Sequence, residues 1–335
     1  MRKISGIIAA SALVASVLFV GPAANAETIA GAGATYPQAL QKACIASYTA
    51  HTVTYSGDGS GTGKTKFATG TTQFGGTDSL YAEGTEPANF TYVPLVGGPI
   101  GIVYNVDGLT NVNLTPKLIS DIFTAKITKW NDPKIVAVNK ASKSKLPDAQ
   151  IQIVYRASTS GTTNNFANYL SQTVGGAWKA NDSWALASGS TTGTAASGGP
   201  GVVSTIKGLK NSIGYVDLAD AATAGLPFAA VQNGAKEFKK PSVPASKLFL
   251  AKQLMNSNGV VLFDYNEVVK GGYNLSLVSY GLAPTKAGTA KATAVKDYLN
   301  YFLNTCSPKE AAALNFVALS GTALKTANKL VARVK

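Results

Sequence analysis

Three short segments combine glycine with small hydroxyl residues, a composition suited to binding an anion. They are residues 31–37, 57–63 and 156–162, and each lies between a predicted strand and a predicted helix. Glycine lets the backbone approach a ligand closely, and Ser and Thr add hydroxyl donors. The helix after each turn offers free N–H groups and the positive end of its dipole. With Arg156, whose guanidinium can contact two oxygens at once, these turns predict an anion-binding site.

The middle turn does not fit a nucleotide-binding motif. Gly63-Lys64-Thr65 matches the end of a P-loop, but the first glycine of that motif is replaced by Asp58, whose carboxylate would face the phosphates. Thr62 stands where the dinucleotide-binding pattern needs its third glycine. The turn is therefore expected to bind an anion without hydrolysing a nucleotide.

The chain lacks the residues that most catalytic sites and metal sites require. The chain has one His, two Cys and two Met, too few for a His-ligated metal centre, a zinc ribbon or a multi-haem carrier. A Ser-His-Asp hydrolase would depend on His51 alone. The serine–lysine spacing of Ser204 and Lys207 arises easily by chance. We therefore expect no enzyme, no cofactor and no metal.

The charge balance favours an anionic partner. The chain has 30 Lys and Arg against 17 Asp and Glu, a formal net charge of +13. Such an excess suits nucleic acid, an anionic membrane or a small anion. The basic residues are scattered, and the short runs at 143–145 and 239–240 have no interleaved aromatic residues. Nucleic acid is therefore not expected as a partner.

Because each of the three turns lies between a strand and a helix, strands and helices should alternate along the chain. The sequence predicts this alternation. Among 335 residues, 45% are hydrophobic and 14% charged, which excludes a disordered chain and allows two domains. The alternation predicts an α/β fold. Thr115-Pro116 is a helix cap followed by proline at the first helical position. The predicted strands are 53–55, 100–104, 151–155, 213–216 and 275–280; the predicted helices are 37–50, 117–123, 162–172, 293–304 and 308–315, with a loop over 187–201.

Residues 1–26 have the features of a secretory signal peptide. Arg2 and Lys3 give a positive start, residues 7–20 form an apolar run, and Ala24-Asn25-Ala26 is a small-x-small cleavage site. The alternative is a membrane anchor, but the run is shorter than the roughly 20 residues that span a bilayer. We expect cleavage before Glu27 and an exported, periplasmic or secreted protein. Since no Cys follows the cleavage site, no lipid anchor is expected there.

Several motifs, in their order along the chain, resemble the phosphate-binding proteins of bacterial ABC phosphate importers. Residues 228–258 and the C-terminus match that family only loosely. The matching motifs are Gly31-Ala-Gly-Ala-Thr-Tyr-Pro37, Tyr55-Ser-Gly-Asp-Gly-Ser-Gly61, Phe74-Gly-Gly-Thr-Asp-Ser79, Leu118-Ile-Ser-Asp-Ile-Phe123, Ile127-Thr-Lys-Trp-Asn-Asp132, Arg156 with Ser160-Gly161-Thr162, and Ser212-Ile-Gly-Tyr-Val216.

This resemblance implies a two-lobed periplasmic-binding-protein fold, type II-like. Two α/β domains would be joined by two crossing strands, near residues 97–101 and 271–276, with the ligand cleft between the domains. Lobe 1 would comprise residues 27–99 and 272–335, and lobe 2 residues 100–271.

The resemblance also implies which residues bind phosphate. Hydroxyl and backbone groups from the three turns would contact the phosphate oxygens, and Arg156 would supply the positive charge. Asp78 would accept a hydrogen bond from a protonated phosphate oxygen. The full set is Thr35, the Tyr36 backbone, Ser60, Asp78, Arg156, Ser160, Gly161 and Thr162.

At one position the chain departs from the family pattern. The family commonly has an acidic residue two positions after the arginine, where it pairs with that arginine, and this chain has Ser158. Arg156 would therefore be less neutralised and its orientation less fixed.

Cys44 and Cys306 are the two cysteines of the chain. Export would permit a disulfide between them. Both fall in lobe 1 of the implied fold, which favours a bridge, and two buried free thiols are the alternative.

With the predicted signal peptide, the resemblance implies high-affinity capture of inorganic phosphate outside the cytoplasmic membrane by a monomer. The phosphate would then pass to the membrane permease subunits of an ABC importer. The alternatives are a binding protein for another oxyanion, such as sulfate or molybdate, and a secreted phosphatase that uses the same anion site.

Overall fold

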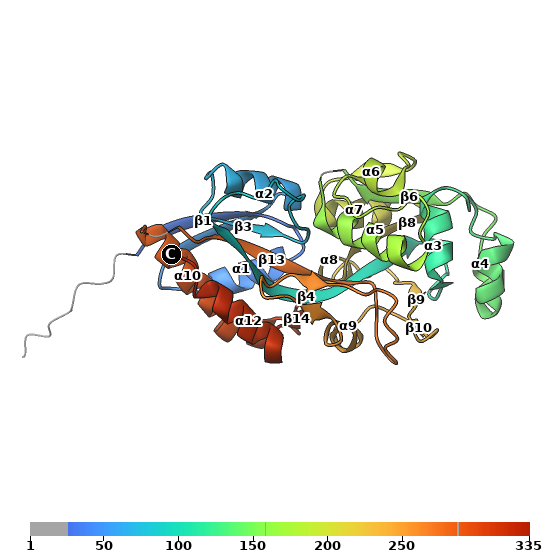
Figure 1. Ribbon diagram of the computed structural model, residues 1–335. Coiled ribbons are helices and arrows are strands. Elements are labelled where there is room, and N and C mark those ends of the chain that lie inside the picture. Colours follow the sequence, from blue (N-terminus) through green and yellow to red (C-terminus); the bar gives the residue numbers. More distant parts are fainter. Residues whose placement is uncertain (1–25, 158, 287) are drawn as a thin grey trace, which may run out of the picture.

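The computed structural model describes residues 26–157, 159–286 and 288–335. These residues form two α/β lobes, with lobe 1 on the left and lobe 2 on the right of Figure 1. The expected signal peptide, except for Ala26, and Ser158 lie outside the described residues. In the described part of the chain, no helix has both the length and the apolar character needed to cross a membrane.

Lobe 1 is built from both ends of the chain. Its sheet has the order β2-β1-β3-β13-β4, with β14 beside β4. β1 runs parallel to β2 and β3, whereas β13 is antiparallel to β3 and β4. Its elements are β1 (Thr28–Gly33), α1 (Gln38–Ser47), β2 (Thr52–Gly57), α2 (Ser60–Ala68), β3 (Phe74–Thr77), β13 (Ser276–Pro284), α10 (Ala290–Tyr301), a π-helical turn (Phe302–Cys306), α11 (Ser307–Glu310), β14 (Val317–Ala318) and α12 (Gly321–Val331).

Lobe 2 continues the same sheet in the order β4-β8-β6-β7. β6 runs parallel to β8 and β7, and α5 and α7 pack beside these strands. Its principal elements are α3 (Pro116–Phe123), β6 (Gln152–Arg156), α5 (Gly161–Thr173), α6 (Trp184–Ser188), β7 (Thr194–Ala196), α7 (Gly198–Gly208), β8 (Ser212–Asp217) and α8 (Leu218–Ala222). Its shorter elements, and those beside β4, are β5 (Asn113–Leu114), α4 (Pro133–Val138), a 3-10 helix (Lys140–Lys145), β9 (Ala230–Gln232), β10 (Phe238–Lys239), α9 (Val243–Leu250), β11 (Leu254–Met255) and β12 (Val261–Leu262).

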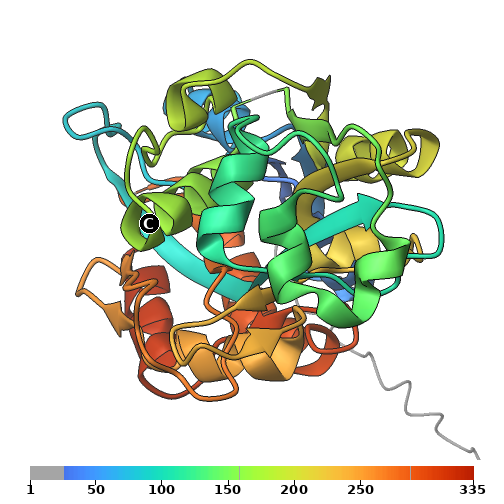
Figure 2. The same ribbon diagram turned by 90° about the vertical axis from the view of Figure 1, so that its right-hand side faces the viewer.

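One long strand, β4 (Phe90–Asn105), passes through both lobes (Figures 1 and 2). Its first part pairs with β13 up to Pro99, and its second part pairs with β8 from Ile100 onward. The returning chain crosses at the same level, because the Ile100 N–H donates to the carbonyl of Leu275 at 2.9 Å. Residues 93–104 of β4 are all buried, as expected for a strand covered on both faces.

The structure differs from the expected loop over residues 187–201. Strand β7 and the first turns of α7 lie inside this segment. The start of α7 was not predicted from the sequence because its first turn contains Gly198, Gly199 and Pro200, residues that are typical of loops. Val202 and Ile206, four residues apart, hold α7 against the sheet.

Two local predictions can be compared directly with the structure. The predicted cap of α3 is confirmed, because Thr115 Oγ1 accepts a hydrogen bond from the Leu118 N–H at 3.2 Å and Pro116 opens the helix. Cys44 on α1 and Cys306 after α10 are bonded in a disulfide, with their Cα atoms 5.5 Å apart. This bond ties two segments of lobe 1 that are 262 residues apart in the sequence.

Candidate functional site

Arg156 and the start of helix α5 form the lobe 2 side of the site. Arg156 is the last residue of β6 and only 3% exposed. Ser160 caps α5, since its Oγ accepts a hydrogen bond from the Thr163 N–H at 3.2 Å. The geometry of an α-helix leaves the N–H groups of its first turn, at Gly161 and Thr162, without partners inside the helix. A buried cation and free helix donors therefore meet at one point.

The lobe 1 side presents a hydroxyl and a carboxyl. Ser60 is the first residue of α2, and Asp78 follows β3; both are buried. The Asp78 N–H donates to Ser60 Oγ at 3.2 Å, which fixes the two residues relative to each other. They lie together because Asp78 follows β3 and Ser60 comes after β2, and these two strands flank β1 and run parallel to it.

The two sides are in direct contact across the cleft. A Cβ atom on Gly161 would lie 2.5 Å from Ser60 Oγ and 2.6 Å from Asp78 Cβ, so only glycine fits there. Asn165 Nδ2, one turn further along α5, donates to the Asp78 carbonyl at 2.6 Å. The second and third predicted turns are therefore brought together in a closed arrangement.

Thr35 and Tyr36 of the first turn are placed differently from each other. Thr35 is buried, and its Oγ1 has no hydrogen-bond partner among the described residues. Its methyl group lies 3.4 Å from the position that a Cβ on Gly198, at the start of α7, would take. The Tyr36 ring instead packs edge-on against Phe316 in lobe 1, with centroids 5.2 Å apart. The ring thus belongs to the core.

The charge of Arg156 is left without a close counter-ion by the described residues. No carboxylate among them forms an ion pair with its guanidinium, and its buried Nε has no hydrogen-bond partner there. A buried unpaired charge is costly to maintain. The site is therefore suited to receiving an anion.

Asp78 lies in an environment that penalises its ionised form. Burial raises the pKa of Asp78 to about 7, although the nearby Ser279 hydroxyl and Arg156 guanidinium partly oppose the shift. One carboxyl oxygen, Oδ1, has no hydrogen-bond partner among the described residues. This carboxyl can accept a hydrogen bond when ionised and donate one when protonated.

Two further carboxyls, Asp217 and Asp220, interact with Arg156. Thr162 Oγ1 donates to Asp217 Oδ1 at 3.3 Å. A Cβ on Gly199 would lie 1.8 Å from Asp220 Oδ2 and 3.5 Å from Asp217 Oδ2, so the carboxyls converge beside the start of α7. Burial raises the pKa of Asp217 well above its usual value, with Asp220 and Asp78 adding to the shift. Burial also raises the pKa of Asp220 to about 6.

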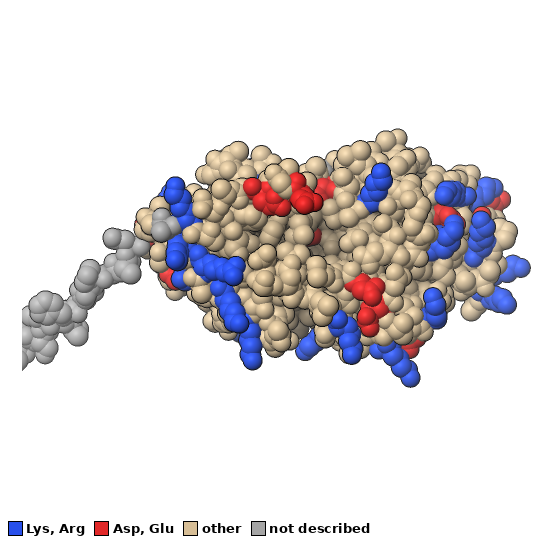
Figure 3. Space-filling model, in the orientation of Figure 1, with Lys and Arg blue, Asp and Glu red and all other residues tan. Residues whose placement is uncertain are grey.

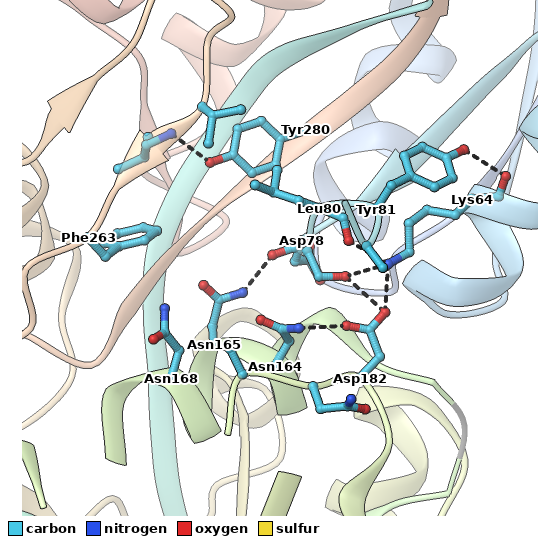
Figure 4. A pocket seen from close by; sticks show the side chains of 16 residues that line it. Lys64, Asp78, Leu80, Tyr81, Asn164, Asn165, Asn168, Asp182, Phe263 and Tyr280 are labelled. Carbon is cyan, nitrogen blue, oxygen red and sulfur yellow. Dashed lines mark hydrogen bonds and ion pairs between the residues drawn. The ribbon is translucent and has the colours of Figure 1, made fainter. Parts of the chain in front are cut away.

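A cavity of about 460 Å³ lies between the lobes, with Asp78 in its lining (Figure 4). At its edge Lys64 Nζ of α2 contacts Asp182 Oδ2 of lobe 2 at 2.9 Å. Ser79 Oγ and Asn164 Nδ2 also donate to the Asp182 carboxylate, each at 2.9 Å. We call this group, Lys64, Ser79, Asn164 and Asp182, the interlobe latch, because it joins lobe 1 to lobe 2.

Comparison with known proteins shows the family to which this chain belongs. The family model described as the PBP superfamily domain matches residues 20–305. The phosphate-binding protein PstS of Xylella fastidiosa strain Temecula1 is 31% identical over 310 residues, which cover 89% of this chain and 83% of that protein. PstS of Haemophilus influenzae is 35% identical over 227 residues, covering 66% and 67%. The chain belongs to the PstS family.

Solved structures support the same fold. A high affinity periplasmic phosphate-binding protein, PfluDING, bound with phosphate, has a TM-score of 0.75 and 22% identity, covering 90% of this chain and 93% of that one. The phosphate-binding protein of Stenotrophomonas maltophilia has a TM-score of 0.70 and 21% identity over the same shares. At these identities the likeness shows the fold alone. The two-lobed α/β fold expected from the resemblance is confirmed.

Within this PstS-family fold, the predicted residues converge from three turns on one region, and the Tyr36 ring packs against Phe316. Sequence reasoning missed Asn165, Asp182, Asp217 and Asp220. Asp217 had a usable signal, because it directly follows the motif that ends at Val216 and so stands at the end of a buried strand. Asp182 had none, since it precedes the short helix α6 in a polar stretch.

Proposed function

We propose that this protein binds inorganic phosphate in the cleft between its lobes and delivers it to an ABC phosphate importer. The observation that carries the proposal is buried Arg156, which has no ion pair with the described residues and lies beside the donor end of α5. The curated relatives named above are phosphate-binding proteins, which supports phosphate as the ligand.

The ligand set follows from the arrangement of the turns. Arg156 supplies positive charge, and Asp78 accepts a hydrogen bond from a protonated phosphate oxygen. The hydroxyl and backbone groups contact the remaining oxygens; these residues are Thr35, Tyr36 through its backbone, Ser60, Ser160, Gly161 and Thr162. Lobe 1, residues 27–99 and 272–335, and lobe 2, residues 100–271, close on the anion by a hinge motion at the crossing strands.

The protein acts outside the cytoplasmic membrane as a monomer and hands phosphate to the membrane permease subunits. Its signal peptide is removed before Glu27. N-terminal sequencing of the exported protein checks the cleavage position, and light scattering on that protein checks its oligomeric state. An intact N-terminus on the exported chain would contradict the cleavage.

Calorimetry tests the ligand. We expect saturable phosphate binding, with sulfate and molybdate unable to compete at equal concentration at pH 8. Effective competition by either anion would show that the protein binds oxyanions in general and is not specific for phosphate. Incubation with a chromogenic phosphate ester, with and without divalent metals, should give no turnover. Turnover that is lost in Arg156→Ala would instead favour the phosphatase alternative.

A further inference from the structure

The hydroxyl of Thr162 has one proton, and a carboxyl competes with phosphate for it. Thr162 is buried and belongs to the proposed phosphate site. Its Oγ1 lies 3.3 Å from Asp217 Oδ1, within hydrogen-bond distance. If Thr162 donates to Asp217, it has no proton left to donate to a phosphate oxygen. The protonation state of Asp217 therefore decides what Thr162 can offer the ligand.

The surroundings of Asp217 disfavour its ionised form. Asp217 is fully buried at the end of β8, and its Oδ2 has no hydrogen-bond partner among the described residues. None of the cations described in the structure lies within ion-pair distance of it. An ionised Asp217 would be a buried charge with a single hydrogen bond, which is costly.

The titratable and charged groups that surround Asp217 add to that cost. Asp220 on α8 lies beside it across Gly199 of α7, and Asp78 faces it from lobe 1. Among the described residues, Arg156 on β6 lowers the pKa of Asp217 and partly offsets these carboxyls, while Lys42 on α1 acts on Asp220. The Tyr36 hydroxyl also interacts with Asp217, and it is neutral because burial and these carboxyls raise its pKa. A bound phosphate would add further negative charge.

We propose that Asp217 is a positioning residue for phosphate, and that in its protonated form it donates a hydrogen bond to Thr162 Oγ1 and so turns the Thr162 proton toward the anion. This inference rests on the proposed phosphate function. The same contact between Thr162 Oγ1 and Asp217 Oδ1 can form with the donor reversed: only hydrogens change position, and no heavy atom needs to move.

The arrangement makes phosphate affinity depend on pH through Asp217. Burial and the neighbouring carboxyls raise its pKa, so the donor form persists to a higher pH than it would in an exposed carboxyl. As pH rises through that pKa, Asp217 ionises, takes the Thr162 proton for itself and repels the anion. Affinity should therefore fall at high pH by more than the ionisation of phosphate and Asp78 explains.

Asp217→Asn separates this effect from the others. The asparagine amide donates to Thr162 at every pH, so its affinity should fall less steeply than that of the parent. Calorimetry with inorganic phosphate at pH 6.5, 7.5 and 9 gives the ratio of the parent Kd to the variant Kd. Contributions from phosphate and Asp78 largely cancel in this ratio, which should rise at least about threefold between pH 6.5 and 9. Asp107→Asn, an exposed carboxyl of lobe 2, is the matched control and should give a constant ratio.

Variants of Thr162 test whether Asp217 acts through that hydroxyl. In a Thr162→Val background, Asp217→Asn should lose most of its effect on the pH profile. Thr162→Ser, which keeps the hydroxyl, should keep the parent profile, and Thr162→Val alone should not; this pair decides the question even if Asp217→Asn fails to fold. A constant parent-to-variant ratio, or an equal effect in the Thr162→Val background, would overturn the inference. Failure of the parent to bind phosphate at any pH would overturn the proposed function instead.

Discussion

At the scale of single residues, the site combines one buried cation with three buried or largely buried carboxyls. Arg156 can contact two oxygens of a tetrahedral anion at once, which a lysine cannot do. Burial raises the pKa of all three carboxyls: to about 7 for Asp78, to about 6 for Asp220, and well above its usual value for Asp217. A carboxyl in its neutral form can donate a hydrogen bond, so each raised pKa reduces the repulsion that an entering anion meets.

Arg156→Ala should weaken phosphate binding by roughly 2–5 kcal/mol, the range for removing one partner of a buried charge pair. Arg156→Lys should recover only part of the loss, because an ammonium cannot replace the planar fork. Calorimetry measures both, and Arg333→Ala, an exposed arginine of lobe 1, is the control. An Arg156→Ala protein that binds within twofold of the parent would show that the site is misassigned.

Asp78 should control selectivity against sulfate in a pH-dependent way. Burial raises the pKa of Asp78 to about 7. At pH 8 it is mainly ionised and accepts a hydrogen bond from a phosphate proton, whereas fully deprotonated sulfate offers none. A site whose buried group stays unpaired rejects the wrong ligand by roughly 10⁴–10⁵. Below pH 6 Asp78 is protonated and can donate to sulfate, so sulfate should compete better as pH falls.

Competition titrations at fixed ionic strength, from pH 5 to pH 8.5, follow this selectivity. Asp78→Asn offers a donor at every pH and should lose much of the discrimination at pH 8, with weaker pH dependence. If the parent excludes sulfate equally at pH 5 and pH 8, or if Asp78→Asn keeps full exclusion, Asp78 does not have this role.

At the scale of elements, two helices that begin at the cleft hold the lobes together. α2 presents Lys64 and α5 presents Asn164, and both contact Asp182 within the interlobe latch (Figure 4). The Lys64 and Asp182 side chains are 14% and 13% exposed, so water screens their attraction only in part. Because the latch joins the lobes only when they are closed, it stabilises the closed state.

Lys64→Met should therefore speed the release of phosphate. Losing one partner of this partly buried pair should raise the release rate about 5- to 100-fold, corresponding to roughly 1–3 kcal/mol, with a smaller effect on association. Stopped-flow fluorescence measures both rates. Lys66→Met is a matched control on the same helix, because Lys66 pairs with Asp58 within lobe 1 at 2.6 Å. Equal release rates in the two variants would rule out a role for the latch in retention.

At the scale of the whole molecule, lobe 1 is closed covalently and the lobes share one sheet. β4 runs through both lobes, and the disulfide between Cys44 and Cys306 ties α1 to the turn that follows α10 within lobe 1. On the face seen in Figure 3, Lys and Arg lie mainly toward the two ends of the molecule. On this face the exposed basic residues therefore do not gather at the site, whose positive charge comes from buried Arg156.

Replacing both Cys44 and Cys306 by Ala should lower the free energy of unfolding by about 2–5 kcal/mol, because the open chain gains conformational entropy in the unfolded state. Phosphate affinity should stay within about twofold, since the bridge lies inside lobe 1 and touches none of the cleft residues. Denaturant titration with and without reducing agent checks the first expectation, and calorimetry the second. A large loss of affinity with little loss of stability would contradict both.

The sequence by itself determined the features that depend on neighbours along the chain. The α3 cap at Thr115 and Pro116 needs only residues within one turn of each other. The hydroxyl and glycine residues before α2 and α5 were recognisable for the same reason, and the ordered motifs were enough to indicate the family. Residues 187–201 were misread because Gly and Pro at a helix start have the composition of a loop.

Only the tertiary structure decided which of these segments meet. Lys64 and Asp182 are 118 residues apart, and Thr162 and Asp217 are 55 apart. Their contacts depend on the strand order and on the closure of one lobe against the other, which no local pattern encodes. The raised pKa values of Asp78 and Asp217 have the same origin, since burial is a property of the packed molecule and not of the chain around each residue.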